Sequence, residues 1–331
     1  GNETVTITNS AGTLLASDLT TAGNATSGTV TVTNGQTVTG TVAEVTAALV
    51  TANSKVEMGS ASMATISNAA TAAEGAPIAT TSNITASFSS GISDTLANLA
   101  IGGSISSNLS SITADQGTVV VTIADGAGGT FQAADFSAVG NATTGAVTVT
   151  NSQTVNGTTD QVIAAVVTSA SKVNLNSASI LNASTYTSQD LSGVGSSFTL
   201  NVTTVDGAVL DATKLVTADT ITIGAGTSSG TSVAVDTLGD NKVTVAIGAT
   251  LNISGYTTET LGGMTNSGTV NVTTANGAVL DAANLADATT ITIGAGIASG
   301  TATGVNTLGE EKITIATGTT LNVSAYTNQE L

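Results

Sequence analysis

The sequence predicts an all-β fold with a few short helices, namely a repetitive β-solenoid whose coils are each about 23 residues long. Three observations predict this fold. The chain repeats itself at fixed distances. Short segments alternate Val or Ile with Thr, as half-buried strands do. Aromatic residues make up only 2% of the 331 residues, so the apolar share consists mainly of small Ala, Val, Ile and Leu, which favour a thin core.

The clearest repeat is 70 residues long, as the three tyrosines show: Tyr186, Tyr256 and Tyr326 occupy the same position in three copies. Each of these copies begins with a lysine before a strand-like segment, and a more divergent fourth copy begins at Lys55. We interpret these positions as architectural. The repeat-defining residues are Tyr186, Tyr256, Tyr326, Lys55, Lys172, Lys242 and Lys312.

A second repeat covers a longer distance. The segment that starts at Gly23 returns at Gly140, 117 residues later, and Lys55 returns as Lys172 at the same distance. If 70 residues hold three coils and 117 hold five, both repeats share a coil of about 23 residues. This predicts a five-coil unit over 1–117, irregular at about 70–117, a shorter copy over 118–199, and three-coil repeats over 200–331 that end within a repeat.

The strand-like triplets and the segments between them define each expected coil. Triplets such as Val30-Thr31-Val32 and Ile313-Thr314-Ile315 place β-branched residues on both faces, as strands prefer. Gly and Asn between the triplets supply corners with positive φ. Segments 41–53 and 158–171 are predicted to be helical. The alternative fold is a series of tandem β-sandwich modules, but such modules usually have about 100 residues and several prolines.

Composition excludes several classes of function. The chain has no His, no Cys and a net charge of −17, and its five basic residues are all Lys. Ser-His-Asp and Cys-His catalysis and zinc sites of the His/Cys type are therefore impossible. Binding to nucleic acid or to an anionic membrane needs clustered cations that the chain lacks. No apolar run is long enough to span a bilayer. We predict that the chain is not an enzyme.

Calcium is the metal that the composition favours, because it prefers carboxylate and carbonyl oxygens. No cofactor is certain from the sequence, and the glycine-rich calcium nonapeptide is missing. The alternative role of these acids is to cap turns and keep the chain soluble. The candidate calcium ligands are Asp125, Asp135, Asp206, Asp211, Asp236, Asp240, Glu310 and Glu311.

The Thr residues of the triplets suggest a second kind of surface. If Val and Ile point inward, Thr points outward on every coil and forms a flat column. Such a face could bind ice or a surface glycan, although β propensity alone also explains the threonines.

The repeats resemble the Thr-, Asn-, Gly- and Ala-rich regions of large secreted bacterial surface proteins, such as filamentous-haemagglutinin-like adhesins and S-layer proteins. Segment 264–280, MTNSGTVNVTTANGAVL, and segments of the GTVAEVTAAL type at 40–49 carry the resemblance. It implies a secreted, cell-surface protein that serves as a scaffold, filament or adhesin stalk. Its expected partners are copies of itself, with surface glycans as a further candidate. Because the sequence begins at Gly1 without a signal peptide, we expect a processed form or a segment of a longer protein.

Overall fold

The computed structural model describes residues 2–51, 53–167, 172–329 and 331. The chain forms two compact units: unit 1 is Gly1–Thr154 with Ala164–Ser179, and unit 2 is Val155–Ile163 with Ile180–Leu331. The division falls within strand β14 (Thr154–Thr158) and helix α7 (Thr159–Val166). The segments 1–117, 118–199 and 200–331 stay a prediction, because the two units are defined by packing and not by repeat boundaries.

Unit 1 contains parallel sheets and helices that alternate along the chain. Its three parallel sheets have the strand orders β1-β3-β5, β2-β4-β6-β7 and β15-β13-β11-β8, and β9 and β10 form an antiparallel hairpin. The strands are β1 (Val5–Ile7), β2 (Thr13–Leu15), β3 (Val30–Val32), β4 (Thr37–Gly40), β5 (Val56–Glu57), β6 (Ser62–Ile66), β7 (Ile84–Phe88), β8 (Ile92–Asp94), β9 (Ala100–Ile101), β10 (Ser104–Ile105), β11 (Val121–Ile123), β12 (Thr130–Gln132), β13 (Val147–Val149) and β15 (Val173–Asn174).

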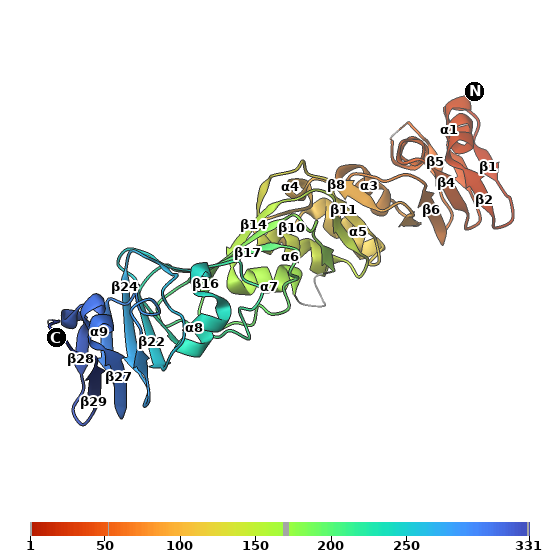
Figure 1. The fold of residues 1–331 in the computed structure, drawn as a ribbon. Helices are drawn as coiled ribbons and strands as arrows, with labels where there is room; N and C mark the ends of the chain where they lie inside the picture. The colour runs from red at the N-terminus through yellow and green to blue at the C-terminus, as the bar shows by residue number, and fades with distance from the viewer. Residues whose placement is uncertain (1, 52, 168–171, 330) are drawn as a thin grey trace. The chain divides into compact units, whose positions relative to one another are not determined.

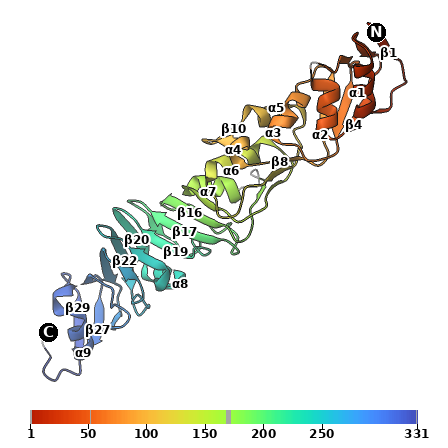
Figure 2. The same ribbon diagram turned by 90° about the horizontal axis from the view of Figure 1, so that it is seen from above.

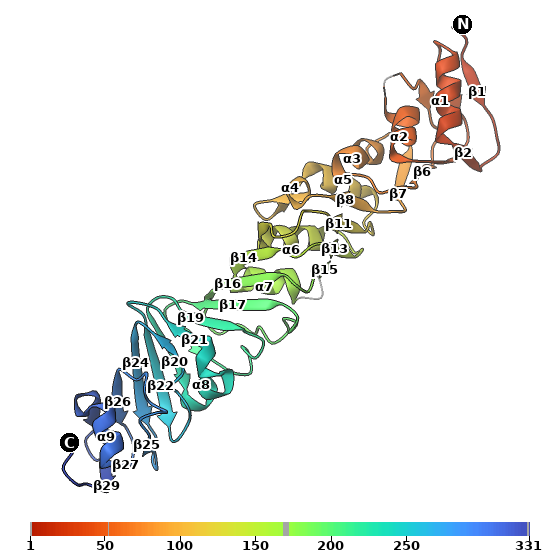
Figure 3. The same ribbon diagram turned by 45° about the horizontal axis from the view of Figure 1, so that its top comes forward.

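The helices of unit 1 join one pair of strands to the next. They are α1 (Ala16–Ala25), α2 (Val42–Val45) with its π-helical continuation η1 (Thr46–Val50), α3 (Ala72–Ala79), α4 (Leu96–Leu99), α5 (Ser107–Asp115) and α6 (Ala133–Ala142). Neighbouring helices α1, α2 and α3 contact one another along the unit (Figure 3). Capping boxes start α2 and α3, where Thr41 pairs with Glu44 and Thr71 with Glu74.

Unit 2 has longer strands and fewer helices. Its sheets have the orders β14-β16-β17-β19-β21-β23, β18-β20-β22-β24-β26-β28 and β25-β27-β29, and β16, β17 and β19 run side by side (Figure 2). The strands are β16 (Ile180–Tyr186), β17 (Thr199–Thr204), β18 (Val209–Leu210), β19 (Thr220–Ile223), β20 (Thr227–Thr231), β21 (Val243–Val245), β22 (Thr250–Tyr256), β23 (Thr265–Asn266), β24 (Thr269–Thr274), β25 (Val279–Leu280), β26 (Thr290–Ile293), β27 (Ile297–Thr301), β28 (Ile313–Ile315) and β29 (Thr320–Ser324).

Two helices in unit 2 occupy equivalent places in the 70-residue repeat. They are α8 (Ser232–Leu238) and α9 (Ala302–Leu308), and each is followed by a short 3-10 turn, η2 (Asp240–Lys242) or η3 (Glu310–Lys312). Helix α9 lies against β27 (Figure 1). Both helices bury the first, fourth and seventh residue: Ser232, Val235 and Leu238 in α8, and Ala302, Val305 and Leu308 in α9.

The prediction of an all-β solenoid is wrong. Helices make up 24% and strands 34% of the structure, and parallel sheets alternate with helices, so the fold belongs to the α/β class. Over the described residues the sheets do not close into a solenoid coil. The sandwich alternative is wrong as well, because the strands of the large sheets pair in parallel, as β17 does with β19, whereas sandwich sheets are antiparallel.

Most of the helices were not predicted, because they are ten residues or shorter and some of them bury small residues beside large ones. Helix α1 buries Ala16, Leu19 and Gly23, which follow helical spacing but look like a loop when only Val, Ile and Thr are counted. The helices predicted over 41–53 and 158–171 correspond to α2 with η1 and to α7, although residues 52 and 168–171 lie outside the described residues.

Like strands of successive segments pair in parallel and in register. Val5-Thr6-Ile7 lies opposite Val30-Thr31-Val32, and Ile291-Thr292-Ile293 lies opposite Ile313-Thr314-Ile315. In both pairs the apolar side chains of the inner strand, Val30 with Val32 and Ile291 with Ile293, are fully buried. We use the word rung for one such turn of the chain, which buries its apolar face against the next.

The 70-residue repeat does not stack each strand on its own equivalent. The equivalent strands β16, β22 and β29 lie in three different sheets. Each 70-residue repeat therefore places its equivalent strand in a different sheet from the strand of the repeat before it. The distance along the chain between paired residues also varies. It is 19 residues between Asn201 and Thr220, and 26 between Asn156 and Asn182. Rungs of unequal length are possible because turns or helices take up the extra residues.

We predict that replacing one leucine at equivalent positions of two repeats will have unequal effects on stability. Leu251→Ala in β22 leaves a cavity in a fully buried site and should lower the free energy of unfolding by about 2–5 kcal/mol. Leu321→Ala in β29 removes a side chain that is only half-buried and should cost less than half as much. Urea denaturation that follows unit 2 measures both losses, and equal losses would contradict this account of the core.

Candidate functional surfaces

Amide side chains form a ladder on the outer face of unit 2. The side-chain nitrogen of Asn182 donates to the side-chain oxygen of Asn156 at 2.7 Å, Asn201 donates to Asn182 at 2.8 Å, and the Thr220 hydroxyl donates to Asn201 at 2.8 Å. A second ladder joins Asn252, Asn271 and Thr290 at 2.9 and 2.8 Å. Such ladders pair amide groups that would otherwise need water, and they hold successive strands in register.

Threonines form columns next to these ladders, as the sequence predicted. In one sheet Thr203 lies opposite Thr222, Thr222 opposite Thr244, and Thr244 opposite Thr265. In the next sheet Thr273, Thr292 and Thr314 are aligned in the same way. All of these side chains are half-buried or exposed, so unit 2 presents ordered rows of hydroxyl and methyl groups to the solvent.

The three equivalent tyrosines have very different environments. Tyr186 and Tyr256 are fully buried, and their hydroxyls donate to the carbonyls of Val209 and Val279 at 3.4 and 3.1 Å. Burial raises the pKa of each of these two phenols to about 12. Tyr326, by contrast, is 62% exposed. The same residue in the same repeat position therefore fills the core in two repeats and faces solvent in the third.

The repeated lysines reach back to the preceding rung. The Lys55 ammonium donates to the Thr26 carbonyl at 2.6 Å, and the Lys242 ammonium donates to the Ala218 carbonyl at 3.1 Å. Lys172 shares with Lys55 a left-handed backbone, with φ of 53° and 54°. Lys312 directly precedes β28. These contacts fit a structural role, in which a charged corner pairs with a carbonyl that the turn leaves free.

The candidate calcium ligands are spread over both units. Within the described residues, no three acidic side chains are grouped so that they could hold a metal ion. Most candidates instead accept a hydrogen bond from a backbone N–H. The donors are Leu96 for Asp125, Gly103 for Asp135, Thr227 for Asp206, Thr213 for Asp211, Thr260 for Asp236 and Asn241 for Asp240, and Glu310 and Glu311 lie in η3.

Asp287 is an acid that sequence reasoning did not single out. Its Oδ2 atom is buried and has no hydrogen-bond partner. Burial raises the pKa of this carboxyl, and the nearby Asp240 adds to the shift. The equivalent residue of the preceding repeat is Thr217, whose hydroxyl donates to the Leu191 carbonyl at 3.0 Å. Comparison of the two repeats, and not the residue type alone, identifies Asp287 as a position where a buried oxygen lacks a hydrogen-bond partner.

Strands β28 and β29 form what we call the open rung: the inward-facing side chains of Ile313, Ile315, Leu321 and Val323, together with Tyr326. These side chains line the free side of two edge strands. Ile315 is 53% exposed, whereas its equivalent Val245 is fully buried because β23 pairs with β21 on that side. Ile313, Ile315, Leu321 and Val323 also line a cavity of about 240 Å³. The open rung is thus an apolar face.

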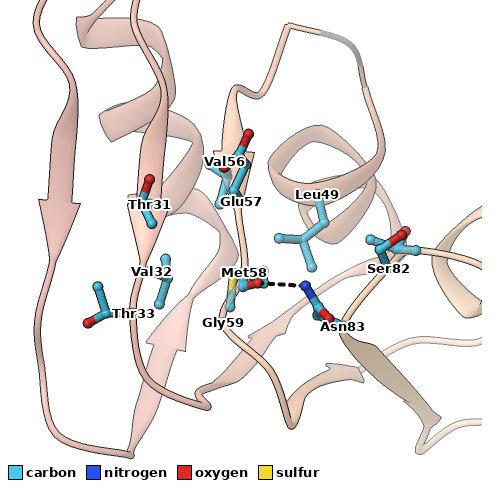
Figure 4. Close-up of a pocket in the computed structure, with 11 residues that line it drawn as sticks. Thr31, Val32, Thr33, Leu49, Val56, Glu57, Met58, Gly59, Ser82 and Asn83 are labelled. Atoms are coloured by element: carbon cyan, nitrogen blue, oxygen red, sulfur yellow. Dashed lines mark hydrogen bonds between the residues drawn. The ribbon is translucent and has the colours of Figure 1, made fainter.

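A larger cavity, of about 560 Å³, lies in unit 1 where the β1-β3-β5 sheet ends (Figure 4). The turn at Ser82 and Asn83 lies across from edge strand β5, and the Asn83 side-chain amide donates to the Met58 carbonyl at 3.1 Å. Buried Leu49 and Met58 line the cavity. The arrangement caps an interrupted sheet, because a side chain occupies a hydrogen bond that the next strand would otherwise make.

No family model matches the chain, and no curated protein sequence matches it. Among the described residues, no helix has the length and apolar character that crossing a membrane requires. The surfaces described above are therefore the features that bear on function.

We predict that Asp287→Thr will stabilise unit 2. The raised pKa means that the folded state favours the protonated acid, so the penalty of the ionised acid is present at neutral pH and is relieved as the pH falls through the raised pKa. The variant should gain about 1 kcal/mol at neutral pH, because threonine can donate to a carbonyl as Thr217 does. The gain should shrink in acid.

Urea denaturation of the wild type and the variant at several pH values measures this gain. Thr217→Asp is the matched reverse variant, and it should lose stability at neutral pH. A gain from Asp287→Thr that stayed constant from neutral to acidic pH would show that ionisation of Asp287 is not its cause.

Proposed function

We propose that the chain is a non-enzymatic structural protein of the cell exterior, a segment of a surface layer, filament or adhesin stalk, which assembles by stacking its repeats. The observation that carries the proposal is the stacking of rungs within each unit. The rung of Ile221 and Ile223 is fully buried by parallel, in-register pairing with a rung on either side. Repeat proteins packed in this way present extended, regular outer surfaces to partners.

Residue types and their surroundings support a non-enzymatic role. The chain lacks His and Cys. The neighbouring carboxylates Asp206 and Asp211 accept hydrogen bonds from backbone N–H groups, those of Thr227 and Thr213. An exterior location is supported by the Thr-, Asn-, Gly- and Ala-rich composition, which resembles that of secreted bacterial surface proteins.

We predict that the purified chain associates as its concentration rises. Sedimentation velocity should show a monomer at low concentration and larger species at high concentration, and negative-stain electron microscopy should show ordered assemblies. Since net charge is −17, added salt should promote association by screening repulsion between copies. Dispersed monomers at every protein and salt concentration would contradict the proposal.

A second candidate function is binding of ice or a surface glycan by the threonine columns. The specific observation in its favour is the aligned row from Thr203 to Thr265, in which neighbouring residues lie on adjacent strands, about 4.8 Å apart. A regular row of hydroxyl and methyl groups can match a regular ligand surface without charged residues.

This candidate predicts that wild-type protein slows ice growth or binds a glycan on an array, and that Thr222→Lys abolishes the effect by placing a long charged side chain in the row. Thr258→Lys, at an exposed turn position outside the columns, is the matched control and should retain the effect. If the wild type neither alters ice growth nor binds any glycan, the candidate is excluded.

A further inference from the structure

We propose that unit 2 has two equivalent binding sites for the sugar residues of an uncharged glycan, one in each of two successive repeats. The inference rests on the proposed function, since a location at the cell exterior brings glycans within reach of the chain. It goes further by naming the residues that bind, the number of sites and the charge of the glycan. The sites use none of the threonines of the columns.

Two hollows on the surface of unit 2 carry the inference, and we call them the first and the second hollow. Their volumes are about 410 and 550 Å³, within the range of about 300–1,000 Å³ that small-molecule sites occupy. Residues at equivalent positions of the 70-residue repeat line both. The lining of the first hollow includes Val209, Asp211, Ser229, Thr231 and Ser254, and that of the second includes Val279, Asp281, Ser299, Thr301 and Ser324.

Strands of unequal length form each hollow. Strand β18 pairs with β20 at only two residues, Ser229 and Gly230, whereas β20 pairs with β22 over five residues. The chain leaves β18 at Asp211, so the outer face of β20 and β22 continues past the end of β18, and α8 follows β20 directly. Strands β25, β27 and β29 repeat this arrangement, with α9 after β27. Because β22 also pairs with β24, the first hollow lies within a continuous sheet.

Each hollow contains one carboxylate. The Oδ1 atom of Asp211 accepts hydrogen bonds from the Thr213 hydroxyl at 2.6 Å and from the Thr213 N–H at 2.9 Å. These bonds hold the pKa of Asp211 below its ordinary value, so this group is ionised at neutral pH. The Oδ1 atom of Asp281 accepts from the Ala283 N–H at 2.8 Å. Within the described residues the hydrogen bonds of both carboxylates go to Oδ1, which leaves Oδ2 to accept from a sugar hydroxyl.

Hydroxyl groups and an exposed valine complete the first hollow. The Thr231 hydroxyl oxygen accepts from the Ala234 N–H at 3.1 Å, so its proton remains to be donated to a ligand. The Ser254 hydroxyl donates to the Gly230 carbonyl only at 3.5 Å, a length at which a hydrogen bond is weak. Val209 is 47% exposed and presents an apolar surface beside these polar groups.

The second hollow has the same features. The Thr301 hydroxyl oxygen accepts from the Gly304 N–H at 3.0 Å, and the Ser324 hydroxyl donates to the Gly300 carbonyl at 3.4 Å. Val279 is 44% exposed. Hydrogen-bond donors, an acceptor and an apolar surface thus occur together twice in the unit.

Buried residues near the hollows changed between the two repeats, whereas the hollow residues did not. Ser228 and Ser232 are fully buried in the first repeat, and Ala298 and Ala302 take their places in the second. The five residues named for each hollow are of the same type in both repeats, although most of them lie on the outer face. Core packing therefore does not explain why they are the same.

The groups in the hollows match a sugar better than other ligands. A sugar ring has hydroxyls that donate and accept hydrogen bonds, and a face of C–H groups that is apolar. An ionised carboxylate makes a stronger hydrogen bond to a hydroxyl than a neutral acceptor does. Among the described residues no lysine lines either hollow, and the net charge is −17, so carboxylated or sulfated glycans are repelled. The glycan is therefore an uncharged one.

Lysine substitutions that fill one hollow at a time provide the test. Val209→Lys fills the first hollow and Val279→Lys the second with a long side chain that can pair with the carboxylate beside it. Both valines are nearly half exposed, so the variants should fold, which circular dichroism verifies. Val233→Lys makes the same change at a residue of α8 that is 59% exposed and does not line the first hollow, and it serves as the control.

The probes are an array of neutral oligosaccharides, such as lactose and cellobiose, and of acidic ones that carry uronate or sulfate. The wild type should bind neutral members only. Isothermal titration calorimetry with the neutral oligosaccharide bound most strongly should then give two sites per chain for the wild type and for Val233→Lys, one for each blocking variant, and none for the double variant. Asp211→Asn, made together with Val279→Lys, should weaken the remaining site by about tenfold, because it removes the charge but keeps an oxygen.

The outcomes separate this inference from the proposed function. If the wild type binds only acidic oligosaccharides or none, or if the double variant still binds at two sites, the hollows are not glycan sites. Loss of binding in Thr222→Lys but not in the double variant would assign the glycan to the threonine columns. None of these results touches assembly, which sedimentation velocity measures. A wild type that binds at both hollows but stays monomeric would contradict assembly and leave the two sites in place.

Discussion

Parallel pairing of each rung with the next is the interaction on which the rest of this structure depends. A rung of about twenty residues has two short strands and one turn or helix, which is too little to bury its own apolar side chains. Ile221 and Ile223 are fully buried only because β17 lies on one side of β19 and β21 on the other. The outward positions follow from the same register, because strands that stack Val on Val on one face must stack Thr on Thr or Asn on Asn on the other.

Pairing between rungs fixes the position and direction of the strands, but it does not fix the conformation of the segments that connect them. A connection can be a helix, as at α8, or a turn, as between β18 and β19, provided that the chain returns to the correct edge in the correct direction. The distance between paired residues therefore varies, and equivalent strands of the 70-residue repeat can lie in different sheets. The repeat visible in the sequence and the rung visible in the structure are different units, and only the rung is a unit of packing.

Strand position and outward threonine columns could be predicted because they depend on a short alternating pattern that is strong in Val, Ile and Thr. The helices could not be predicted in the same way, since the buried faces of α1 and α8 include Ala16, Gly23 and Ser232, which carry little hydrophobic signal. The roles of the acidic residues were harder to predict than the helices. Asp206 has the carboxylate that a calcium ligand needs, yet it accepts a hydrogen bond from Thr227 N–H on the next rung, and only the three-dimensional structure shows that partner.

The β1-β3-β5 sheet stops inside unit 1, and its edge at β5 shows how a stack is interrupted. The side-chain amide of Asn83 donates to the Met58 carbonyl, Met58 itself is buried, and a turn takes the place of the next strand. Proteins commonly protect an edge strand in this way to prevent further pairing. Where no such cap is present, as at β19, each face of the strand pairs with a further rung, and Ile221 and Ile223 are fully buried as a result. A single side-chain hydrogen bond therefore decides whether a rung ends a sheet or continues it.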